Sequence, residues 1–175
     1  MAGAQAIARR GLLAAALAAL AGCGFRPLYG TGGRDSEVQA RLSEINVQLI
    51  PERSGQLLRQ ALQTRLDRGA PPVGRRYDLA VQYVLSSEAI GIQPDTSASR
   101  VRLMGVANWV LSAQDAQRTT VASGSSREVD AINVINQQFF SAELTSTAVQ
   151  RRMVDALAEQ IVTQLAVHFA RRAPG

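Results

Sequence analysis

Residues 76–87 read RYDLAVQYVLSS, and their alternation of apolar and polar side chains decides the fold class. Apolar residues occupy every second position from Tyr77 to Leu85, and the polar set between them is interrupted only by Val84. A period of two predicts a β-strand with one face in a core and the other open to water. This one-sided pattern favours an antiparallel sheet, because strands of parallel sheets are covered on both faces and are apolar throughout.

Two further strands are predicted downstream. Residues 88–99, EAIGIQPDTSAS, contain Gly91 and Pro94 and are expected to form a loop. Residues 100–112 then place one apolar face on a third strand, made of Val101, Leu103, Ala107, Trp109 and Leu111. Residues 118–130 are more polar and are expected to pair with the third strand as a hairpin.

Helical patterns lie before and after these strands. Residues 45–50, INVQLI, predict a short first strand that Pro51 ends, and residues 54–68 predict an amphipathic helix with Ser54 as its cap. Residues 143–171 predict a last helix whose apolar stripe holds Val154, Leu157, Ile161, Leu165 and Phe169. The predicted fold is α+β: a four-stranded, mostly antiparallel sheet covered by two helices, in the order β-α-β-β-β-α. Residues 41–172 are expected to form this single domain, in which the first helix returns the chain beside the first strand.

The amino-terminal residues have the layout of a secretory signal. Arg9 and Arg10 precede an apolar run over 11–21, which is shorter than the roughly 20 residues of a transmembrane helix. The run ends in Leu-Ala-Gly-Cys at 20–23, which resembles the lipobox of bacterial lipoproteins. That resemblance implies cleavage of residues 1–22, acylation of Cys23 (palmitate) and a tether over 23–40. Gly24, where an Asp would signal inner-membrane retention, indicates the outer membrane. The alternative is an ordinary signal peptide with an incidental cysteine.

Composition and missing motifs restrict the function. The formal net charge is +5, and all 19 basic residues are Arg, an excess too mild to suggest a nucleic-acid partner. The sole cysteine cannot form a disulfide within the chain. The single histidine, His168, is expected at the edge of the core, and no nucleophile elbow or metal-ligand spacing occurs. We therefore expect a binding or assembly module rather than an enzyme, without metal or cofactor; a tethered periplasmic hydrolase is the alternative.

The segment CGFRPLYG at 23–30 resembles the start of the mature LptE lipoproteins, especially those of alphaproteobacteria. The resemblance implies an outer-membrane lipoprotein that sits in the lumen of the β-barrel LptD, partners and plugs it, and contacts lipopolysaccharide as it is placed in the outer leaflet. The competing assignments are an auxiliary lipoprotein of an envelope lipid-transport ABC system and a structural lipoprotein that binds peptidoglycan.

Three sets of residues are candidates for these contacts. Arg100, Arg102 and Arg118 lie at predicted strand ends and are expected to bind lipopolysaccharide phosphates; a solvated face or barrel carboxylates are the alternative. Phe25, Pro27 and Tyr29 are candidates for partner contact, or else for packing of the tether on the protein's own sheet. Polar strand residues are expected to meet a polar barrel lumen, namely Gln82, Asn108, Thr120 and Ser126.

Overall fold

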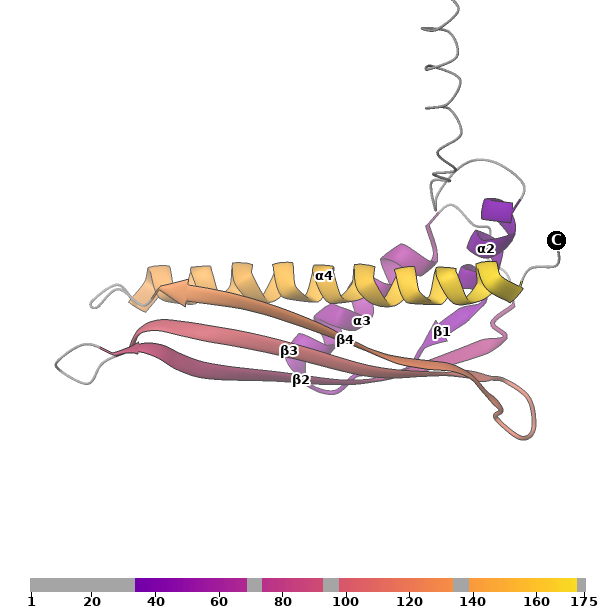
Figure 1. Cartoon of the computed structure of the whole chain (residues 1–175), viewed down its shortest axis with the longest axis horizontal. Coiled ribbons are helices and arrows are strands. Elements are labelled where there is room, and N and C mark those ends of the chain that lie inside the picture. The colour runs from indigo at the N-terminus through magenta and orange to yellow at the C-terminus, as the bar shows by residue number, and fades with distance from the viewer. Residues whose placement is uncertain (1–33, 69–73, 93–97, 134–138, 173–175) are drawn as a thin grey trace, which may run out of the picture. The chain divides into compact units, whose positions relative to one another are not determined.

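The computed structural model describes residues 34–68, 74–92, 98–133 and 139–172. Within these ranges the chain forms a four-stranded sheet and three helices, which confirms the α+β class (Figure 1). The predicted order β-α-β-β-β-α is present, with one further helix in front of it. The elements are α2 (Arg34–Ser43), β1 (Ile45–Val47), α3 (Glu52–Leu66), β2 (Tyr77–Ile92), β3 (Ala98–Ala113), β4 (Thr120–Asn133) and α4 (Phe139–Arg172).

The sheet is mixed but mostly antiparallel. Its strand order is β1-β2-β3-β4, so every strand lies beside its neighbour in sequence. β1 pairs with β2 in parallel, with Ile45 opposite Tyr77 and Val47 opposite Leu79. The β2–β3 and β3–β4 pairs are antiparallel. The helix α3 therefore returns the chain beside β1, as the sequence predicts.

The core lies between one face of the sheet and the helices. The helix α4 has 34 residues and β3 has 16, so both are about 50 Å long. Figure 1 shows α4 running beside β2–β4 for most of their length, and α4 packs on β3, β4, α2 and α3. The predicted apolar faces are confirmed: the buried residues include Leu79, Val81, Leu103, Ala107, Trp109 and Leu111 from the strands and Val154, Leu157, Ile161, Leu165 and Phe169 from α4.

A polar clamp holds α4 against the middle of the sheet. The indole Nε1 of Trp109 donates to the Gln164 side-chain oxygen at 3.2 Å. The Gln164 amide in turn donates to the backbone oxygen of Ser125 at 3.2 Å and to the Ser126 hydroxyl at 3.1 Å. Ser126 is only 3% exposed, so the expectation that it faces a partner is wrong. Its hydroxyl is buried because it accepts a hydrogen bond from the Gln164 amide.

The helix α2 is not predicted by the sequence analysis, which places residues up to 40 in the tether. It carries only two buried apolar side chains, Val38 and Leu42, at a spacing of four. Packing against α4 and α3 stabilises it more than its own sequence pattern does. Arg75, just before β2, fixes the end of α2 and the start of β1, because its guanidinium donates to the backbone oxygens of Ser43 and Ile45 at 2.7 and 2.8 Å.

Most predicted boundaries differ from the structure by a few residues, and three of the differences change the local structure. The first strand ends at Val47 rather than at residue 50. The helix α3 begins at Glu52 with Pro51 at its N-cap, so Ser54 is not the cap. The strand β2 continues to Ile92 through residues that the sequence indicates as a loop, because Glu88 and Ala89 still pair with β3. Among the described residues no helix is both long and apolar enough to cross a membrane.

Candidate functional site

The face of the sheet that points away from α3 and α4 is not covered by any described element. We call it the open face; its central residues are Gln82 and Val84 on β2, Asn108 and Val110 on β3, and Ser125 and Val129 on β4. The register places Gln82, Asn108 and Ser125 in one row across three strands. All three are exposed, as the alternation of the strands predicts for Gln82 and Asn108.

The open face mixes these polar residues with exposed valines. Val84 is 63% exposed, Val129 47% and Val110 40%. Val84 lies opposite Val106, which is half-buried. Arg127 of β4, opposite Val106, adds one exposed charge to this otherwise small polar and apolar surface. Exposed apolar side chains gathered beside polar ones and an arginine are typical of interfaces, where arginine is the enriched charged residue.

A shallow groove crosses the open face near β1. It is lined by Leu49, Gln82, Asn108, Val110 and Ser125, among others. Leu49 is 74% exposed, whereas its neighbour Ile50 is 1% exposed. Sequence alternation places Leu49 on the same face as Ile45 and Val47. Leu49 lies on the other face because β1 ends at Val47 and the chain changes direction after it. No sequence signal reveals that change of direction.

Arg100 and Arg102 lie together at the far end of β3, beside the β2–β3 connection. Both are exposed, and Arg102 forms an ion pair with Glu88 at 3.5 Å. An exposed pair of this kind contributes at most about 1 kcal/mol, so a phosphate can compete for Arg102. Arg100 has no ion pair among the described residues. This end of the sheet therefore offers two guanidinium groups to an anion.

Arg118 lies at the opposite end of the sheet, in the turn between β3 and β4. The strand β3 separates it from Arg100 by about 40 Å, at 3.3 Å per residue. Its backbone has a φ of 49°, the left-handed region, and its N–H donates to the Asp115 backbone oxygen at 3.1 Å. The structure thus brings together two of the three predicted arginines and leaves the third apart.

Asp78 defines the surroundings of Arg118. Its carboxylate accepts from the Asn46 and Gln114 side-chain amides at 2.8 and 3.0 Å. The hydrogen bond from Asn46, then that from Gln114 and the charge of Arg118, hold the pKa of Asp78 below its ordinary value despite its partial desolvation. Arg118 therefore faces a carboxylate of its own chain, and its role as a phosphate ligand has less support than that of Arg100 and Arg102.

The remaining candidates have different outcomes. Cys23, Phe25, Pro27 and Tyr29 lie outside the described residues. Thr120 is exposed at the start of β4. His168 lies in the last turns of α4 and is half-buried, as expected for the edge of the core. Within the described part of the chain, no group of His, Cys, Asp and Glu residues could hold a metal ion.

Comparison with solved structures shows the same fold in other bacterial lipoproteins. A protein from Caulobacter crescentus CB15, described as a lipoprotein, superposes with a TM-score of 0.60 at 26% identity, over 79% of this chain and 98% of that one. The rare lipoprotein B from Shewanella oneidensis gives 0.56 at 9% identity, over 74% and 97%. A minor lipoprotein from Acinetobacter baumannii gives 0.51 at 14% identity, over 70% and 90%.

Comparison by sequence points to one family. A search of curated proteins finds no match. The model of the LptE lipopolysaccharide-assembly family, by contrast, matches residues 42–165, from the end of α2 to the last turns of α4. That range holds the whole sheet, and the lipoprotein fold of the solved structures agrees with it. This chain is an envelope lipoprotein of lipopolysaccharide assembly, and it belongs to the LptE family.

Proposed function

We propose that this protein partners with the β-barrel LptD at the outer membrane and plugs its lumen through the open face. The lipid at Cys23 would anchor the chain on the periplasmic side, and the protein would contact lipopolysaccharide with Arg100 and Arg102. It acts by binding rather than by catalysis.

The observation that carries this proposal is the character of the open face. A sheet in a two-layer fold normally buries its second face or makes it strongly polar, yet this one exposes valines next to short polar side chains. Gln82, Asn108 and Ser125 can exchange hydrogen bonds with the polar side chains that line a barrel lumen. Val84, Val110 and Leu49 can bury apolar area at the same time.

Copurification tests the partner. The protein carries a carboxyl-terminal tag, outer membranes are dissolved in mild detergent, and the proteins recovered with the tag are identified. We expect stoichiometric LptD with the wild type. Recovery with an inner-membrane lipid transporter, or with isolated cell wall instead of a barrel, would replace the proposal with the ABC-associated or peptidoglycan-binding alternative.

A substitution in the open face tests the surface. Asn108→Trp places a large side chain at the centre of the row Gln82, Asn108 and Ser125 without touching the core. We expect recovery of LptD to fall about tenfold, as for loss of a central interface contact. The control, Gln60→Trp, adds the same side chain at an exposed position of α3. Equal recovery with both variants would show that the open face is not the contact surface.

Charge reversal tests the arginine site. We expect the Arg100→Glu/Arg102→Glu double variant to bind labelled lipopolysaccharide about tenfold more weakly, because two charge-assisted phosphate contacts are lost. The Arg76→Glu/Arg118→Glu double variant makes the same change of charge at the other end of the sheet. Binding to the purified proteins should remain near the wild-type value in that variant. An equal loss in both would indicate non-specific electrostatic attraction, and no loss in either would remove the site.

The lipid at Cys23 has a direct test. Because the thiolate sulfur is the attachment atom, we expect labelled palmitate to be incorporated by the wild type and not by a Cys23→Ala variant. A wild type that incorporates no palmitate would make Cys23 an incidental cysteine of an ordinary signal peptide, and incorporation that persists in the variant would place the acyl chain on another residue.

A further inference from the structure

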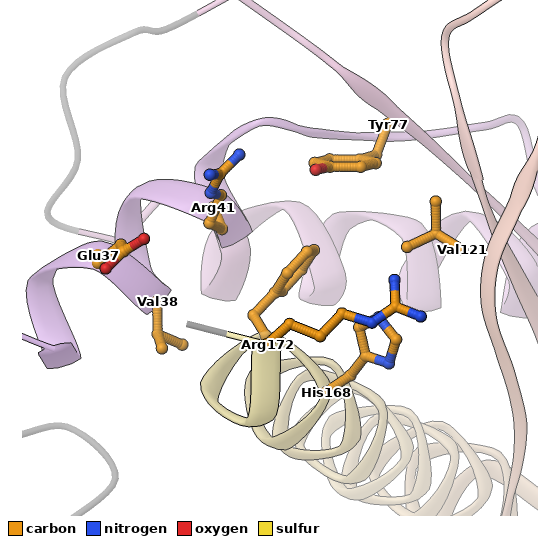
Figure 2. Close-up of a pocket in the computed structure, with 8 residues that line it drawn as sticks. Glu37, Val38, Arg41, Tyr77, Val121, His168 and Arg172 are labelled. Atoms are coloured by element: carbon orange, nitrogen blue, oxygen red, sulfur yellow. The ribbon is translucent and has the colours of Figure 1, made fainter. Parts of the chain in front are cut away.

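A separate cavity lies at the end of the domain opposite Arg100 and Arg102. It is formed where α2, the first residues of β2 and β4, and the last turn of α4 meet (Figure 2). Its volume is about 160 Å³, well above the roughly 10–15 Å³ that a single water needs. Figure 2 shows Arg172 and His168 of α4 on one side of it and Tyr77 and Arg41 on the other.

The floor of this cavity is apolar. Val38 and Phe169 are buried, at 6% and 8% exposure, and Val121 is half-buried. The rings of Tyr77 and Phe169 lie with centroids 5.5 Å apart, and the His168 ring meets Phe169 edge-on at 5.6 Å. Packing from four elements thus fixes the walls, so the cavity is a built feature of the fold.

The rim carries hydrogen-bond donors that have no acceptor among the described residues. Arg172 forms no ion pair there. The nearest carboxylate oxygen to Arg41 belongs to Glu44 at 3.7 Å, which is too long for a hydrogen bond. Among the described residues, the His168 Nε2 is buried without a partner. Buried polar groups normally find partners, so the unpaired His168 Nε2 beside these two arginines indicates a missing ligand.

The charge of the lining selects the ligand. The lining holds two guanidinium groups and one carboxylate, that of Glu37, and Glu44 beside Arg41 is shared with Arg76 outside the cavity. Burial, together with the charge of Arg172, lowers the pKa of His168 and so favours its neutral imidazole. The net charge of the lining is therefore positive by a single unit and matches a monoanion better than a dianion. Donors on several sides suit the tetrahedral oxygens of a phosphate better than a planar carboxylate.

We propose that this cavity binds a phosphodiester group, with Arg41 and Arg172 holding its oxygens over the apolar floor of Val38 and Phe169. A phosphodiester carries one negative charge and organic substituents on both sides, which the floor can bury. The anionic headgroup of a glycerophospholipid has this chemistry, and free inorganic phosphate is the other source of the same oxyanion. The proposal is independent of the partner barrel and of the arginine site on β3.

Binding in the cavity can be followed by NMR at His168, because it is the only histidine of the chain. The protein, purified in a neutral detergent, is labelled with ¹³C-histidine, and the pKa of His168 is read from its single ring resonance by NMR. The probes are dihexanoylphosphatidylglycerol, inorganic phosphate and acetate, each compared with sodium chloride at equal ionic strength. A bound anion favours the protonated imidazole, so we expect dihexanoylphosphatidylglycerol to raise the pKa of His168.

Two variants identify the residues. Arg172→Gln removes a guanidinium that lines the cavity, and we expect this variant to bind dihexanoylphosphatidylglycerol about tenfold more weakly. Arg171→Gln removes the same charge from the same helix end but does not line this cavity, and we expect it to bind like the wild type. Each variant is compared with itself without probe, because Arg172 also affects the resting pKa of His168.

The outcomes separate the sources of the ligand. Tighter binding of dihexanoylphosphatidylglycerol than of inorganic phosphate assigns the site to a lipid headgroup, and equal or weaker binding assigns it to free phosphate. The proposal is overturned if neither phosphate probe shifts the resonance beyond sodium chloride. It is also overturned if acetate acts equally well, or if Arg171→Gln and Arg172→Gln weaken binding to the same extent.

Discussion

Replacing Leu157 with alanine is expected to lower the free energy of unfolding by about 3–5 kcal/mol. Leu157 is fully buried in α4, and its Cδ1 atom lies over Gly105 of β3. A methyl group built on Gly105 would lie 3.2 Å from that atom. Because glycine has no side chain that could move into the space, the cavity left by Leu157→Ala stays open, which places the loss in the upper part of the range for buried leucines.

Denaturant unfolding followed by the fluorescence of Trp109, the only tryptophan, measures this loss. Val84→Ala serves as the control, because Val84 is 63% exposed on the open face and its truncation leaves no cavity. We expect the control to change stability by less than about 0.5 kcal/mol. A loss below about 1 kcal/mol for Leu157→Ala would show that α4 does not pack on β3 in this way.

The layers of the fold could be predicted because their sequence periods are strong. The alternation over 76–87 and the helical stripe of 143–171 each identify one buried face, and burial confirms both. The helix α2 could not be predicted in the same way, since Val38 and Leu42 alone do not make a stripe. The end of β2 was missed for a related reason: pairing with β3, rather than local composition, keeps residues 88–92 in the sheet.

The candidate surfaces depend on tertiary structure more than the layers of the fold do. Arg100 and Arg118 each begin a predicted strand, and in an antiparallel hairpin the starts of neighbouring strands lie at opposite ends, so the predicted pattern itself argues against grouping them. The exposed Leu49 and the cavity between Arg41 and Arg172 have no local signal. They arise from where β1 ends and from the meeting of α2 with the end of α4, and only the assembled domain brings those residues together.

A single added methyl group at Gly124 is expected to disturb the clamp between the sheet and α4. A Cβ atom there would lie 2.6 Å from the Cζ2 atom of Trp109 and 2.8 Å from the side-chain oxygen of Gln164. Neither neighbour can move freely, since Trp109 is 3% exposed and the two side chains are hydrogen-bonded to each other. We expect Gly124→Ala to destabilise the protein by about 1–3 kcal/mol, the usual effect of overpacking a core.

Gly74→Ala is the matched control, because a Cβ atom at Gly74 would meet nothing within 4 Å. We expect that variant to be as stable as the wild type, or slightly more so, since alanine reduces the freedom of the unfolded chain. In Gly124→Ala, the displaced indole should also shift the emission maximum of Trp109 in the folded state, because Nε1 loses its bond to Gln164. A stable Gly124→Ala variant with unchanged emission would mean that Trp109 does not occupy the space beneath α4. The close contact of β4 with that helix would then have to be explained without the clamp.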